Sequence, residues 1–178
     1  MPKPEVWGPP VWTLFHVLIE KLHEDAYHKI GPPLFQMFVR ICKNLPCPEC
    51  SKDATKFLAK IKIADLKNKS DLKNTFYIFH NYVNTRKRSP LFNFSKMDNY
   101  KKYNILHTIN RFIQHYHTNG NMQLLNESFQ RKFVVRDFKS FIKKNILAFI
   151  HKNEVPLLLS NKNPNKNPNK IDDENKKG

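Results

Sequence analysis

The 178-residue chain is poor in the residues from which several common functional sites are built. Its 4 Gly argue against a glycine-rich nucleotide-binding turn. It has no run of about 18 apolar residues, so the sequence predicts no membrane-spanning helix. The opening segment Met1-Pro2-Lys3-Pro4-Glu5 lacks the apolar core of a secretory signal. We therefore expect the protein to stay on the cytosolic side and not to be secreted.

Cysteine is also scarce, with only Cys42, Cys47 and Cys50 in the chain. Three cysteines are too few for a disulfide scaffold, and at least one of them must stay unpaired. In a cytosolic protein a close pair indicates redox chemistry or metal binding more often than a structural crosslink.

Acidic residues are outnumbered, since 31 Lys and Arg face 15 Asp and Glu and give a formal charge of +16. Such an excess favours anionic partners. An equally good interpretation is that an A+T-rich genome enriches Lys and Asn. Composition alone leaves both open.

Strand-period alternation is missing as well, whereas apolar residues recur at helical spacings of three and four through the first hundred residues. The pattern predicts a first helix within residues 5–30, opened by Gly8-Pro9-Pro10 and ended by Gly31-Pro32-Pro33. Three further helices are expected at about residues 34–44, 46–60 and 70–86, the last capped by Ser70-Asp71. The sequence thus predicts an all-α helical bundle.

A second region follows this bundle. Residues 103–116 and 134–150 have helical patterns, and residues 118–121 read as a turn. We assign residues 104–155 to a C-terminal helical extension of unknown role. Residues 156–178 contain a polar Asn-Pro repeat that cannot bury enough apolar surface to order itself, so we predict a disordered tail.

The strongest chemical feature is the Cys47-Pro48-Glu49-Cys50 segment at the start of the third predicted helix. The spacing lets both sulfurs meet at a helix N-terminus, which favours a thiolate and so a reversible redox pair. A zinc site would need two more ligands, and the nearest histidine pair, His23 and His28, precedes the cysteines. A structural disulfide is the third possibility.

Two aromatic and polar segments flank the cysteines in sequence. Trp12 and His16 share one helix face and could stack on a flat heterocycle, although a core tryptophan with a hydrogen-bonded histidine is the commoner arrangement. His80, Val83 and Asn84 lie on one helical stripe beside Asn81. These groups could hold a polar ring system, or they could form a solvated helix end. The basic run at residues 86–88 could neutralise a pyrophosphate or face solvent.

The ordered set W-G-x-x-x-W with His16, then C-x-x-C, then H-N-x-V-N resembles the Erv/ALR family of sulfhydryl oxidases over about residues 5–103. The likeness is greatest to small members encoded by large DNA viruses that assemble in the host cytoplasm. It implies a FAD-binding four-helix bundle with a short fifth helix in residues 1–103. The implied site comprises the redox pair Cys47 and Cys50 and the FAD contacts Gly8, Trp12, His16, His80, Asn81, Val83, Asn84, Lys87 and Tyr100.

The chain departs from the family pattern at several positions. The lysine often found five residues after the last Asn of H-N-x-V-N is Ser89 here, which leaves Lys87 or Arg88 as the basic contact. Tyr100 or Tyr103 is the aromatic residue that would close the FAD site. No cysteine follows Cys50, so a second or shuttle pair is missing. We expect Cys42 to be a buried, apolar side chain.

The resemblance implies a thiol oxidase that passes electrons through FAD to O2, forms H2O2, and takes them from a thiol protein that reaches Cys47 directly. A small thioredoxin-like partner with an accessible C-x-x-C would suit. We further expect a homodimer through the first two helices, location in the host cytoplasm or virion, and docking of the basic residues 101–152 on nucleic acid or an acidic virion protein. The alternative function is a zinc-stabilised basic helical module that binds nucleic acid.

Overall fold

Only helices and their connections occur in the computed structural model, which describes residues 3–116 and 125–150. The all-α prediction is confirmed for these residues. None of their helices is both long and apolar enough to cross a membrane. The predicted turn at residues 118–121 and the predicted tail at residues 156–178 lie outside the described residues. With η for a 3-10 helix, the elements are α1 (Pro4–Lys21), α2 (Tyr27–Lys43), α3 (Pro48–Leu58), η1 (Ile63–Asp65), α4 (Lys69–Arg86), η2 (Phe94–Lys102), α5 (Ile105–Tyr116), α6 (Leu125–Asn145) and η4 (Ile146–Ala148).

The prediction that one helix spans residues 5–30 is wrong, because the chain turns between α1 and α2. Leu22 ends α1, and the connecting residues contain neither Gly nor Pro. The backbone N–H of His23 donates to the carbonyl of Ala148 at 2.8 Å, so the turn is held from the far end of the described chain. This tertiary bond leaves no local sequence signal.

Both Gly-Pro-Pro segments lie inside helices, not at helix boundaries as predicted. Each begins at the fifth residue of its helix, in α1 from Pro4 and in α2 from Tyr27. A proline inside a helix cannot donate to the carbonyl four residues earlier. Here those carbonyls belong to exposed residues, where water can satisfy them: Glu5 and Val6 in α1, His28 and Lys29 in α2.

Gly31 is required in α2 by a close neighbour. A Cβ atom there would lie 2.6 Å from the ring of Tyr27, which is buried against it. The Tyr27 hydroxyl donates to the carbonyl of Leu66 at 3.0 Å. The ring therefore ties α2 to the connection between α3 and α4.

Side-chain caps fix the starts of α3 and α4. Cys47 is the N-cap of α3, and its sulfur accepts from the Cys50 N–H at 3.2 Å. For α4 the cap is Asn68, not the predicted Ser70-Asp71. Asn68 and Asp71 bond reciprocally to each other's backbone N–H groups and form a capping box. These caps fix where the two helices begin, and the first of them involves the disulfide itself.

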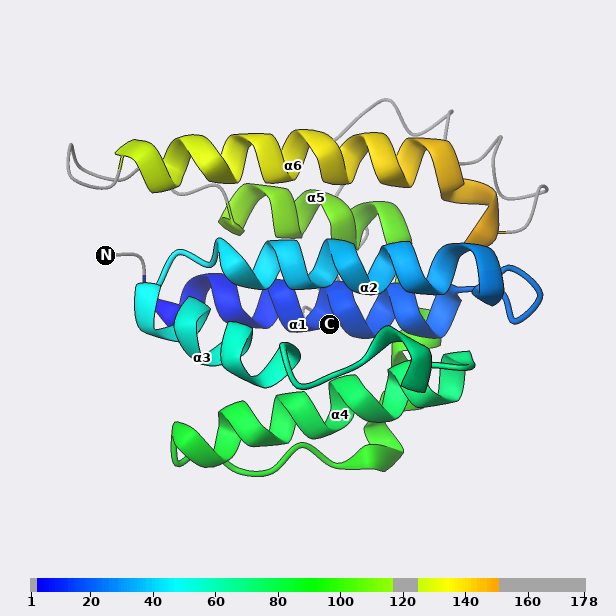
Figure 1. Ribbon diagram of the computed structural model, residues 1–178, viewed down its shortest axis with the longest axis horizontal. Helices are drawn as coiled ribbons and strands as arrows, with labels where there is room; N and C mark the ends of the chain where they lie inside the picture. The colour runs from blue at the N-terminus through cyan, green and yellow to red at the C-terminus, as the bar shows by residue number, and fades with distance from the viewer. Residues whose placement is uncertain (1–2, 117–124, 151–178) are drawn as a thin grey trace, which may run out of the picture.

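The C-terminal helices share the core of the first four. Figure 1 shows α5 and α6 along one side, α1 and α2 in the middle, and α3 and α4 on the other side. α5 packs on α1 and α6 on α2, and Phe112 and Phe138 are fully buried in the common core. α5 and α6 therefore cover part of the surface of α1 and α2, and the homodimer through these two helices stays a prediction. α6 begins at Leu125, whereas the sequence predicted a start at residue 134. The prediction missed the first turns of this helix because they have little apolar periodicity.

A buried ion pair joins α1 to α4. The Glu20 side chain is 1% exposed, and one carboxylate oxygen lies 2.6 Å from Lys73 Nζ. Lys101 Nζ lies 3.8 Å from the other oxygen. The pair therefore ties the end of α1 to the first turns of α4.

Candidate functional site

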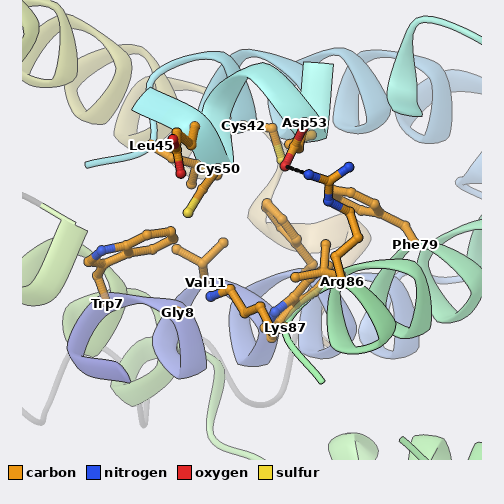
Figure 2. A pocket seen from close by; sticks show the side chains of 15 residues that line it. Trp7, Gly8, Val11, Cys42, Leu45, Cys50, Asp53, Phe79, Arg86 and Lys87 are labelled. Carbon is orange, nitrogen blue, oxygen red and sulfur yellow. Dashed lines mark ion pairs between the residues drawn. The ribbon is translucent and has the colours of Figure 1, made fainter. Parts of the chain in front are cut away.

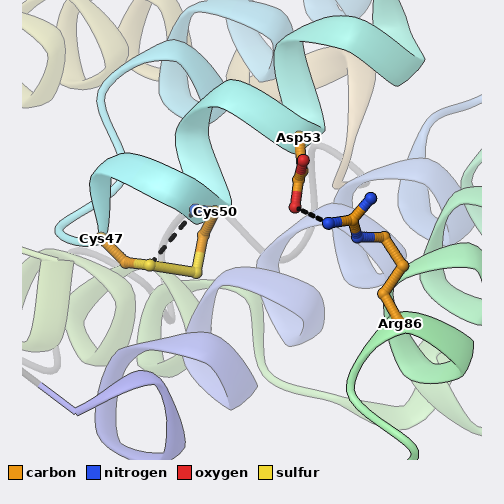
Figure 3. Close-up of a disulfide and its surroundings, with 4 residues drawn as sticks. All are labelled: Cys47, Cys50, Asp53 and Arg86. Atoms are coloured by element: carbon orange, nitrogen blue, oxygen red, sulfur yellow. Dashed lines mark hydrogen bonds and ion pairs between the residues drawn. A yellow bond between two sulfur atoms is a disulfide. The ribbon is translucent and has the colours of Figure 1, made fainter.

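Cys47 and Cys50 form a disulfide at the N-terminus of α3, with their Cα atoms 5.2 Å apart (Figure 3). The backbone N–H of Cys50 points at the Cys47 sulfur. When the bond is broken, this N–H and the helix N-terminus stabilise negative charge on that sulfur. Both side chains are partly exposed. The two cysteines that were predicted to act as a pair are therefore bonded to each other and partly exposed.

A cavity of about 230 Å³ lies between α1, α3 and α4, and Cys50 lines it whereas Cys47 does not. Figure 2 shows the Cys50 side chain pointing from α3 toward α1, above Val11. Trp7, Phe79 and Lys87 line other parts of the same cavity. The disulfide therefore presents one sulfur to a largely apolar space and leaves the other outside it.

A second cavity of about 340 Å³ adjoins the first. The two share a wall made of Gly8, Trp12, Val83 and Lys87. A Cβ atom at Gly8 would meet no heavy atom within 4 Å, so this glycine leaves space open beside both cavities. The two spaces form one elongated site that runs from the disulfide along α1 and α4.

Stacked rings close the second cavity. His80 stacks on Trp12 with ring centroids 4.1 Å apart, and Phe92 stacks on His80 with ring centroids 4.8 Å apart. His16 lies behind this stack, fully buried, with its Nε2 at 3.0 Å from His80 Nδ1. Tyr100 approaches His16 at 5.0 Å between centroids and lines the cavity. Flat, apolar faces therefore dominate one wall.

The two histidines are neutral at physiological pH. Burial, with smaller contributions from His80 and Lys73, lowers the pKa of His16 to about 3. Burial lowers the pKa of His80 to about 4. One ring must therefore donate and the other accept in the hydrogen bond that joins them. The Nδ1 atom of His16 is buried without a hydrogen-bond partner among the described residues.

Positive charge lies near both cavities. Lys87 lines both, with its Nζ 6.0 Å from the Trp7 ring centroid. Arg86 lines the first and forms an ion pair with Asp53 at 2.8 Å (Figure 3). Since Asp53 lies one helical turn after Cys50, this ion pair fixes α3, and the disulfide with it, against α4. Lys87 has no ion pair among the described residues and is the cation placed to meet an anionic group.

The two asparagines of the H-N-x-V-N segment hold the loop after α4. Asn81 bonds to the backbone of Phe92 twice, donating to its carbonyl at 3.1 Å and accepting from its N–H at 2.7 Å. Asn84 donates to the carbonyl of Pro90 at 3.0 Å and also lines the second cavity. Asn81 lines neither cavity. It acts here by placing Phe92 against His80.

The predicted site residues thus gather in one region but occupy different positions in it. His80, Asn84 and Tyr100 line the second cavity. His16 and Cys47 line neither cavity, but His16 contacts His80 of the second and Cys47 is bonded to Cys50 of the first. Sequence reasoning missed Phe92 and Asp53. Asp53 carries a weak signal, since it follows Cys50 at helical spacing. Phe92 lies in a loop and has none.

Cys42 is buried, as predicted, and lies in the wall of the first cavity (Figure 2). Burial raises the pKa of its thiol, which stays protonated. The zinc alternative gains no support, because the Cys47 and Cys50 sulfurs are bonded to each other. Among the residues that the structure describes, no three His, Cys, Asp or Glu side chains gather around a common point.

Comparison with known proteins gives one match. Residues 9–104, more than half of the chain, match the family model described as the Erv1 / Alr family. No curated protein and no solved structure shows significant similarity to the chain. The matched range contains the disulfide, the two stacked histidines and all of α1–α4 except the first turn and a half of α1.

Proposed function

The chain belongs to the Erv1 / Alr family, whose members are sulfhydryl oxidases and typically bind a flavin, and we propose that it is a FAD-dependent thiol oxidase that forms disulfides in partner proteins. The observation that carries the proposal is the placement of the disulfide. Cys50 of the Cys47–Cys50 disulfide lines an aromatic cavity, whereas Cys47 lies outside that cavity and is partly exposed.

The residues around the site fit FAD. Together the two cavities lie in the size range of cofactor sites, and they are joined where Gly8 leaves space. Trp12 offers a flat face and Lys87 a free cation for the pyrophosphate. His80 and Asn84 would contact the polar end of the cofactor. When bound, FAD would accept two electrons from the reduced cysteine pair and pass them to O2, giving H2O2.

The protein's own groups account for the thiol chemistry. A substrate thiolate attacks the Cys47 sulfur, the Cys47–Cys50 bond breaks, and Cys50 leaves as a thiolate facing the cavity. The second substrate thiol, deprotonated, attacks the substrate sulfur of the mixed disulfide and releases Cys47 as a thiolate, which the Cys50 N–H stabilises. The substrate has then lost two electrons and two protons, and the pair has gained the two electrons.

Several finer expectations remain part of the proposal. Since no cysteine follows Cys50, the partner must reach Cys47 directly, which suits a small thioredoxin-like protein. We retain the predictions of a viral origin and of action in the host cytoplasm or virion. A homodimer would have to use surfaces other than the faces of α1 and α2 that α5 and α6 cover. Docking of the basic residues 101–152 on nucleic acid or an acidic virion protein also stays a prediction.

Flavin content and oxygen uptake test the proposal. Purified protein should be yellow, release FAD on denaturation, and consume O2 with dithiothreitol. Cys50→Ser should lose this turnover while keeping the flavin, because it removes the sulfur that faces the cavity. Cys42→Ala is the matched control, and its turnover reports whether the third thiol takes part. A colourless, folded preparation, or full turnover by Cys50→Ser, would exclude the proposed function.

A further inference from the structure

A basic pocket lies next to the disulfide, on the other side of the Leu45–Ser51 segment from the flavin cavities. It has a volume of about 320 Å³ and is formed where the end of α2 and the start of α3 meet α6. Leu45 lines both this pocket and the cavity that contains Cys50. Pro48, the neighbour of Cys47, lines its rim. A group bound here would therefore lie next to Pro48, one residue from Cys47, the partly exposed cysteine that does not line the first cavity.

Arg131 of α6 forms the floor of this pocket. Arg131 is only 2% exposed, yet its Nε has no hydrogen-bond partner among the described residues. No carboxylate of the described residues forms an ion pair with Arg131. A buried guanidinium N–H without a hydrogen-bond partner is costly, since burial removes hydration that nothing replaces. Such a group normally has an anion to bind.

The rest of the pocket carries the same sign of charge. Lys43 and Lys52 line it, both exposed and neither paired among the described residues. The lining also contains the polar Gln130 but no carboxylate. The Ser51 hydroxyl is already engaged, because it donates to the Lys43 carbonyl at 2.6 Å. The free donors are therefore cationic or amide groups, which suits a carboxylate ligand.

We propose that the pocket formed by Arg131, Lys43 and Lys52 binds a glutamate or aspartate side chain that lies near the reactive cysteine of the thiol substrate. The inference rests on the proposed oxidase function and specifies its substrate class. The bound carboxylate pairs with Arg131 while the neighbouring cysteine thiolate reaches Cys47. This also gives α6 a role, because Arg131 and Gln130 come from the helix that covers α2.

The test uses pairs of short dithiol peptides that differ at one residue. Each pair places Glu or Gln one to four residues before a C-x-x-C, and oxygen uptake gives kcat/KM for both members. The best pair should favour Glu by about tenfold, the effect of one charge-assisted bond worth about 1.4 kcal/mol. The ratio of the two kcat/KM values cancels any change that a variant causes in flavin content or in Cys47 reactivity.

Variants of the protein then test whether the preference for Glu over Gln arises from this pocket. Arg131→Met should remove it, and the rim variant Lys43→Gln/Lys52→Gln should reduce it several-fold. The rim variant keeps the test decisive if Arg131→Met fails to fold, because both lysines are exposed. Lys56→Gln is the matched control, since Lys56 is an exposed lysine of the same helix as Lys52 but lies outside the pocket. It should retain the full preference.

Binding provides a readout that does not depend on turnover. Labelled peptides with serine in place of both cysteines should bind the wild-type protein with the same Glu preference, measured by fluorescence anisotropy, and salt should weaken it. Equal kcat/KM values and equal affinities for every Glu and Gln pair would overturn the inference. So would an equal loss of preference in Lys56→Gln. A protein without flavin or dithiothreitol oxidation would instead refute the underlying oxidase function.

Discussion

The neutral histidine pair predicts a steep loss of stability in mild acid. Both His16 and His80 have a folded-state pKa below the ordinary value, at about 3 and about 4. In the unfolded chain both would titrate near 6.5. Below that pH both histidines are therefore protonated in the unfolded chain but stay neutral in the folded protein. The stabilising contribution is complete above about pH 6.5 and is lost as the pH falls toward the folded-state values.

The size of the loss follows from the proton count. For each histidine that stays neutral in the folded protein, the free energy of unfolding falls by about 1.4 kcal/mol per pH unit. A drop from pH 6.5 to 5 therefore lowers it by about 2 kcal/mol for each of the two histidines. Solvent screening at the partly exposed His80 reduces the sum to about 3 kcal/mol. That is a large part of the ordinary stability of a domain of this size.

Urea unfolding followed by circular dichroism at pH 7 and pH 5 measures this difference. The series stops at pH 5 because Asp98 and Asp137, whose pKa values are lowered by hydrogen bonds from Lys101 and Arg136, add their own dependence at lower pH. His80→Phe keeps a ring between Trp12 and Phe92 and should lose about half of the pH dependence. His107→Gln, at an exposed histidine, should keep all of it. A wild-type free energy of unfolding that changes by less than about 0.5 kcal/mol between the two pH values would refute the reasoning.

Three further outcomes are expected. Gly8→Leu should yield a folded protein without flavin, as measured by circular dichroism and visible absorbance. Gly8→Ala is the control and should keep the flavin, because its Cβ meets open space. Retention of flavin by Gly8→Leu would contradict the assigned cavity. Lys73→Met should lower the free energy of urea unfolding by about 3 kcal/mol, because it leaves the buried Glu20 carboxylate with only Lys101 nearby, while the exposed Lys60→Met should change it little. Phe112→Ala should cost about 3–5 kcal/mol, and Phe129→Ala, 54% exposed, less than about 1; equal effects would show that α5 is not part of the core.

The sequence predicted the helices well where apolar periodicity was strong and poorly where tertiary contacts decided the outcome. Gly-Pro-Pro is an ordinary signal for a helix boundary, yet both copies lie inside helices because the carbonyls they leave unpaired can reach water. The true turn after Leu22 contains no such signal and depends on the bond from His23 to Ala148. Local rules could not have located it.

The candidate site shows the same difference between features that local sequence determines and features that tertiary contacts determine. The spacing of Cys47 and Cys50 predicted a pair at a helix start, because both the bond and the cap depend on four consecutive residues. The pairing of His16 with His80 joins separate helices, and the motif order suggested only that they belong to one site. The bonds of the Asn81 amide to the Phe92 backbone could not be predicted either, because Phe92 lies in a loop eleven residues away. Pattern identifies which residues matter, whereas packing decides what each one touches.

The C-terminal helices connect stability to substrate choice through one packing arrangement. α5 and α6 bury Phe112 and Phe138 against the same core that carries the disulfide and the cavity. Because α6 is anchored there, Arg131 is held beside the start of α3, where its Nε has no hydrogen-bond partner among the described residues. A more loosely attached helix would let that guanidinium swing into water and relieve the cost of its burial. The packing of α6 therefore keeps Arg131 in the wall of the pocket that Pro48 also lines, where the proposed acidic side chain of the substrate would bind.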